Sequence, residues 1–127
     1  MIVNTPISLG ELIDKISILI IKEKNIQDSA KLVLIKNELK LLNDTVSKVL
    51  KVDNIKDYLD KLIEINSQLW KIEDDIRECE HKKNFDENFV QLARLVYVTN
   101  DKRAAIKLEI NKKFGSEIIE VKSYNKY

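Results

Sequence analysis

The sequence is poor in the residues that make tight turns and cross-links. Its 127 residues include two glycines, one proline and one cysteine, Cys79. All-β folds need many turns, which use glycine and proline, so the scarcity of both argues against that class. A single cysteine excludes an internal disulfide framework and is typical of a reducing compartment. We therefore predict an all-α cytoplasmic protein that forms a single domain over residues 1–127.

The sequence also lacks an excess of charge and a long apolar segment. It has 22 basic and 21 acidic side chains, a net charge of +1, so no overall field attracts nucleic acid or an anionic membrane. No apolar run is longer than Ile18–Ile21, far short of the ~20 residues that span a bilayer. Residues 1–6 have no charged segment followed by an apolar one, so they do not resemble a signal peptide. We expect neither nucleic acid nor a membrane as a partner.

Hydrophobic residues recur at helical spacing along most of the chain. This period predicts helices over about 8–25, 29–52, 54–82 and 86–114, followed by a short extended tail over 116–127. The connections between these helices are short, which makes sequential neighbours antiparallel. We therefore expect an up-down four-helix bundle built from antiparallel helical hairpins.

The first predicted helix has a clear start and two apolar faces. Ser8 and Glu11 form a capping box, in which the Ser8 hydroxyl accepts from the Glu11 amide. Ile18 and Ile21 lie outside the main apolar stripe, beside Asp14. A helix that is apolar on both sides is either central in a bundle or part of a subunit interface. We expect a homo-oligomer that forms through this helix.

Polar side chains interrupt the apolar pattern on two of the predicted helices. The helix over 54–82 carries one such stripe, and the helix over 86–114 carries a second in the middle of its length. In an antiparallel hairpin that turns near residue 84, the two stripes face each other. The residues that we predict to line the resulting ligand-binding cleft are Asn66, Trp70, Glu73, Arg77, Arg94, Tyr97, Asp101 and Arg103.

The side chains of this predicted cleft suit an anionic small molecule. Arginine binds phosphate or carboxylate through two parallel N–H groups, and an aromatic ring can stack on a base or sugar. The chain has 19 lysines but only three arginines, which makes the arginines notable. The ligand would be of the phosphate, nucleotide or sugar-phosphate type. Ordinary helix ion pairs, or a break of the second helix at Thr99–Asp101, explain the same pattern without a ligand.

Two other functions compete with a binding module. The first is a metal-dependent hydrolase or transferase for phosphorylated metabolites, in which acids such as Glu73 would hold Mg²⁺. The second is an oligomerising adaptor that uses the helix over 8–25. We nominate no metal ligand, because Cys79 and His81 lack a second pair of zinc ligands. We nominate no catalytic nucleophile, because the single thiol lies on an apolar helix seam and no Ser or Thr has a histidine placed by a motif. No cofactor is expected outside the hydrolase alternative, and whether the protein is an enzyme stays open.

Several segments resemble a small family of helical proteins of unknown function from bacteria and phages. The segments are PISLGELIDK (6–15), LWKIEDDIR (69–77), NDKRAAIK (100–107), FGS (114–116) and VKSY (121–124). Together they extend over nearly the whole chain. The resemblance implies a compact helical domain, and it carries no activity, substrate or catalytic residue with it.

Overall fold

The computed structural model describes residues 1–127, except for the side chain of Val52. The described chain folds into four α-helices, α1 (Leu9–Asn25), α2 (Ser29–Val49), α3 (Val52–Lys82) and α4 (Glu87–Lys113). The described residues form no β-strand, which confirms the prediction of an all-α protein. None of the described helices is long and apolar enough to cross a membrane.

Side-chain caps fix the beginnings of three helices. Ser8 Oγ accepts a hydrogen bond from the backbone N of Glu11 at 3.1 Å, as the capping box predicts. Asp28 caps α2 and Asp86 caps α4 in the same way. α3 begins two residues earlier than the predicted start at residue 54. Asp53 therefore lies in the first turn of α3, where a negative charge is favourable for the helix dipole.

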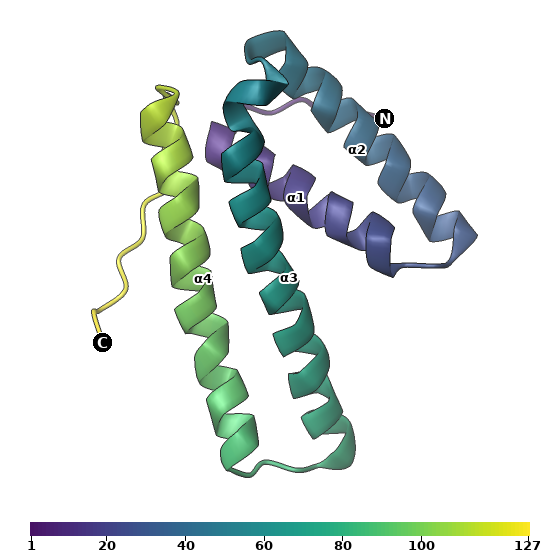
Figure 1. The fold of residues 1–127 in the computed structure, drawn as a ribbon, viewed down its shortest axis with the longest axis vertical. Coiled ribbons are helices and arrows are strands. Elements are labelled where there is room, and N and C mark those ends of the chain that lie inside the picture. Colours follow the sequence, from purple (N-terminus) through teal and green to yellow (C-terminus); the bar gives the residue numbers. More distant parts are fainter.

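The helices form two hairpins of unequal size (Figure 1). Successive helices run in alternate directions, and α3 and α4 form the longer hairpin (Figure 1). The α1–α2 hairpin lies obliquely across one end of it, so α1 contacts α2, α3 and α4. α1 has 17 residues and α3 has 31, so α1 covers only part of the longer hairpin. The regular up-down four-helix bundle is therefore not confirmed.

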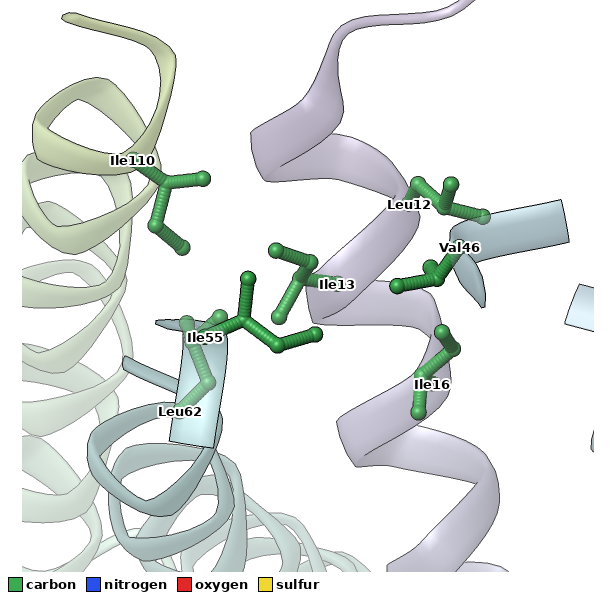
Figure 2. Packing of buried hydrophobic residues seen from close by; sticks show 7 residues of the cluster. All are labelled: Leu12, Ile13, Ile16, Val46, Ile55, Leu62 and Ile110. Atoms are coloured by element: carbon green, nitrogen blue, oxygen red, sulfur yellow. The ribbon is translucent and has the colours of Figure 1, made fainter. Parts of the chain in front are cut away.

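The main hydrophobic cluster surrounds α1 (Figure 2). Ile21, on the second apolar face of α1, is also buried and is only 3% exposed. α1 is apolar on two faces because it is packed between other helices of the same chain. The homo-oligomer stays a prediction, and the apolar character of α1 no longer argues for it. The seven buried residues of the cluster are Leu12, Ile13, Ile16, Val46, Ile55, Leu62 and Ile110.

A glycine lets α1 and α4 approach closely. The backbone N of Gly10 donates a buried hydrogen bond to Asn111 Oδ1 at 2.7 Å. A Cβ atom at position 10 would lie 2.5 Å from the backbone O of Lys107, so no larger residue fits without a shift. This contact brings the next turn of α1, which carries Asp14, against the polar side chains of α4.

α4 continues without a break through Thr99, Asn100 and Asp101. Thr99 is buried, so this stretch packs as part of the helix. The alternative of a helix that breaks here is therefore wrong. In a continuous helix Arg103 comes to lie beside α1, where a charged side chain needs a partner.

Residues 117–127 form neither helix nor strand and lie alongside α4 (Figure 1). Near the start of this tail the Glu120 carboxylate lies 3.1 Å from Lys107 Nζ. At its end the Tyr127 hydroxyl donates to the Asp101 carboxylate. The tail is therefore attached to α4 at two points, although the predicted extended form is not confirmed.

Candidate functional site

A buried carboxylate organises the contact between α1, α3 and α4. Asp14 is 0% exposed, although it lies on a helix of largely apolar residues. Arg103 Nε donates to Asp14 Oδ1 at 2.9 Å, and Arg103 Nη2 donates to Asp14 Oδ2. Asn66 Nδ2 donates to Asp14 Oδ1 at 2.8 Å. This bidentate arginine–carboxylate pair with an added amide fixes the orientation of the guanidinium group.

The polar groups around Asp14 satisfy one another. Ser17 Oγ donates to the backbone O of Asp14 at 2.6 Å and accepts from Asn66 Nδ2 at 2.8 Å. No described side-chain N or O atom is both buried and without a hydrogen-bond partner. A buried charge is tolerated only when it is paired and hydrogen-bonded, and Asp14 meets this requirement.

Lys107 joins the same cluster from the next turn of α4. Its Nζ lies 2.7 Å from Glu11 Oε2, 3.1 Å from Glu120 Oε2 and 3.9 Å from Asp14 Oδ2. Burial alone would lower the pKa of Lys107, but the hydrogen bonds to Glu11 and Glu120 outweigh it and raise this pKa. The hydrogen bond to Asp14 likewise raises the pKa of Arg103 against the effect of burial. Both side chains therefore stay cationic.

A cleft of about 400 Å³ opens beside this cluster, between α1, α3 and α4. We call it the α1/α3/α4 cleft. Arg103, whose side chain is 25% exposed, connects the buried cluster to it. The walls carry two cations, two carboxylates, two amides and an indole, over an apolar floor. The lining residues are Lys22, Asn66, Trp70, Glu73, Asp74, Asn100 and Arg103, with Ile18, Ile21 and Leu69 as the floor.

Four of the residues predicted to bind a ligand meet in this cleft. They are Asn66, Trp70, Glu73 and Arg103. Lys22 lies in the same cleft, as its position on α1 allows. The three arginines do not come together, because only Arg103 reaches the cleft.

The other predicted residues lie elsewhere for reasons of helix geometry. Arg77 is one turn beyond Glu73 and pairs with it on the surface, at 3.4 Å. Arg94 is nine residues from Arg103, about half a turn out of phase, and donates to Gln91 on the surface.

Tyr97 and Asp101 lie on the side of α4 that faces the tail. Asp101 is two residues from Arg103, about 200° around the helix, so the two cannot share one face. The Tyr97 ring instead lies against the ring of Tyr127, with centroids 5.3 Å apart.

Asp14 and Lys107 also belong to the buried cluster, and neither was predicted from the sequence. The available signal was a carboxylate on the inner side of an apolar helix, because such a group must find a cation. No equivalent signal marks Lys107, which is one of 19 lysines. The described residues contain no cluster of three or more His, Cys, Asp or Glu side chains placed to hold a metal ion.

These features define a small all-α protein with a polar cleft beside a buried ion-pair cluster. The chain belongs to a family of unknown function (DUF6165), whose model matches residues 3–127. No curated protein and no solved structure matches the chain. Its function is therefore inferred from the geometry of the site.

Proposed function

We propose that the α1/α3/α4 cleft binds a small ligand of the sugar-phosphate type, with an anionic group next to several hydroxyls. The observation that carries this proposal is Arg103, which is held by buried Asp14 and whose side chain, 25% exposed, lines the cleft. A guanidinium that is already oriented loses little further conformational entropy when a ligand binds.

The cationic side of the cleft has hydrogen-bond donors that the protein itself does not use. Arginine has five N–H groups, and the hydrogen bonds of Arg103 within the described chain use three of them, two with Asp14 and one with Asn100. Lys22 adds a second cation from α1. Phosphate oxygens are good acceptors for both types of donor.

The acidic side of the cleft selects against a bare anion. Glu73 and Asp74 line the same space, and carboxylates repel phosphate but accept hydrogen bonds from hydroxyl groups. Trp70 offers an apolar ring that can cover the C–H face of a sugar. A phosphorylated sugar satisfies both halves of the cleft, whereas inorganic phosphate satisfies only one.

Calorimetry with a panel of hexose and pentose phosphates tests this proposal. We expect saturable binding that weakens at least about tenfold when the parent sugar or inorganic phosphate replaces the sugar phosphate. Lys22→Gln should weaken binding about fivefold, because it removes one charged contact. Lys15→Gln is the matched control, since Lys15 is on the same helix but pairs with Glu38 of α2 at 3.1 Å.

A second matched pair tests the acidic side. Asp74→Asn should weaken binding of the sugar phosphate but not binding of inorganic phosphate, because it replaces one acceptor oxygen for hydroxyls by an NH2 group and removes a charge that repels phosphate. Asp75→Asn should change neither, because Asp75 lies outside the cleft and pairs with Lys71. Equal effects within each matched pair would contradict a ligand in this cleft.

A further inference from the structure

The C-terminal tail borders a second hollow, along the side of α4 that carries Tyr97 and Asp101. It has two compartments, of about 560 Å³ and 510 Å³, both of the size of small-molecule sites. Asp101, Lys122, Tyr124, Asn125 and Tyr127 line both compartments. We call the two compartments together the tail cleft. Among its lining residues, only Asn100 also lines the α1/α3/α4 cleft.

The tail is anchored on both sides of this hollow. Glu120 pairs with Lys107, and the hydrogen bonds of Lys107 and Lys122 hold the pKa of Glu120 below its ordinary value. Tyr127 donates to Asp101 and packs against Tyr97. Residues 121–126 therefore run between two fixed points, which gives the hollow a defined wall.

One compartment of the tail cleft is aromatic. Tyr97, Tyr124 and Tyr127 line it together with Val96. Tyr124 is 78% exposed as a residue, so the folded chain buries little of its surface. A planar ring of a ligand could pack against these rings in an offset-stacked or edge-to-face arrangement, which aromatic groups prefer.

The other compartment has a small excess of positive charge, although two of its lysines, Lys107 and Lys122, pair with Glu120. Lys107, Lys122 and Lys126 line it, against the two carboxylates of Asp101 and Glu120. Lys122 Nζ lies over one face of the Tyr124 ring, 5.6 Å from its centre, in a cation–π contact. A ligand that bridges the compartments would place a ring among the tyrosines and an anionic group at the lysines.

We propose that the tail cleft binds a nucleoside phosphate, with the base against Tyr124 and the phosphate at Lys122 and Lys126. Stacking does not require a particular base, because every nucleobase has an aromatic face. Lysine serves as the charge partner for phosphate. The proposal does not depend on a ligand in the α1/α3/α4 cleft, because Tyr124, Lys122 and Lys126 do not line that cleft.

The proposal is tested by titrating the full chain with adenosine monophosphate and measuring binding by calorimetry and NMR. We expect saturable binding that is at least about tenfold tighter than binding of adenosine or of inorganic phosphate alone. Tyr124→Ala should weaken binding about tenfold, because it removes the stacking surface. Lys126→Gln should weaken it several-fold, whereas Lys113→Gln, an exposed lysine in the last turn of α4, should leave it unchanged. Both tail positions are exposed, so the variants should keep the wild-type circular dichroism spectrum.

Two results would overturn this inference. Equal affinity for adenosine and its monophosphate would show that the lysines contribute nothing. Binding that survives Tyr124→Ala but weakens in Lys22→Gln would place the nucleotide in the α1/α3/α4 cleft instead. Binding of a sugar phosphate should weaken in Lys22→Gln and stay unchanged in Tyr124→Ala. This comparison tests the α1/α3/α4 cleft separately, so the two proposals can fail independently.

Discussion

Replacement of Asp14 by asparagine should strongly destabilise the fold. The substitution keeps the shape of the side chain but removes the charge that two donors of Arg103 share. Loss of one partner of a buried ion pair typically costs about 3–5 kcal/mol, because the remaining charge is left uncompensated. Arg103 is 25% exposed and can be partly hydrated, so we expect the lower end, about 3 kcal/mol.

This free energy corresponds to a measurable change in melting temperature. Unfolding entropy is about 2.1 cal/mol/K per residue, or about 0.27 kcal/mol/K for 127 residues. A loss of about 3 kcal/mol should therefore lower Tm by about 11 °C in thermal denaturation followed by circular dichroism. Urea denaturation should show the same loss as a lower midpoint without a change in slope.

A surface ion pair supplies the control. Glu38→Gln removes the partner of Lys15, and both of these side chains are about half exposed, so the cost should stay below about 1 kcal/mol. The double variant Asp14→Asn/Arg103→Gln should lose less than the sum of its single variants, because no stranded charge remains. A Tm of Asp14→Asn within a degree or two of the wild type would refute the reasoning, since it would mean that Asp14 and Arg103 do not depend on each other.

Three further predictions follow from other parts of the fold. Gly10→Ala should destabilise the protein by about 1–2 kcal/mol despite a better helix propensity, because its Cβ would press on the backbone of Lys107; urea denaturation measures this. Ile13→Ala should cost about 3–4 kcal/mol in the same assay, because Ile13 is 0% exposed at the centre of the core. The pKa of Glu120 is lowered by its hydrogen bonds with Lys107 and Lys122, so the docked tail should be stabilised above the ordinary pKa of 4.5 and released as pH falls through the lowered value. Amide exchange of the tail should follow this pH dependence, and Glu120→Gln should abolish it.

The helices could be predicted from the sequence because their signals are local. The capping box at Ser8 and the aspartate caps at 28 and 86 act within one turn, so they do not depend on the rest of the fold. The oblique packing of the two hairpins could not be predicted. It depends on the close approach at Gly10, which the one-dimensional pattern does not distinguish from any other glycine.

The candidate site was only partly predictable, because facing residues on different helices depend on phase. Asn66, Trp70 and Glu73 follow one face of α3, so their common location could be inferred from spacing alone. The prediction put Arg103, Asp101 and Tyr97 in one cleft. In the structure only Arg103 lines that cleft, whereas Asp101 and Tyr97, on the same stretch of α4, face the tail. Adjacent positions on a helix differ by about 100°. Without that angle, a list of polar residues combines side chains that line two different clefts.

The fluorescence of Trp70 gives the most direct test of a ligand in the α1/α3/α4 cleft. Trp70 is the single tryptophan of the chain and lines this cleft, so selective excitation reports on this region alone. We expect a saturable change in emission when hexose or pentose phosphates are added, with a weaker response in Lys22→Gln and an unchanged response in Lys15→Gln. An emission spectrum that stays constant up to millimolar sugar phosphate, or that responds equally in both variants, would contradict the account.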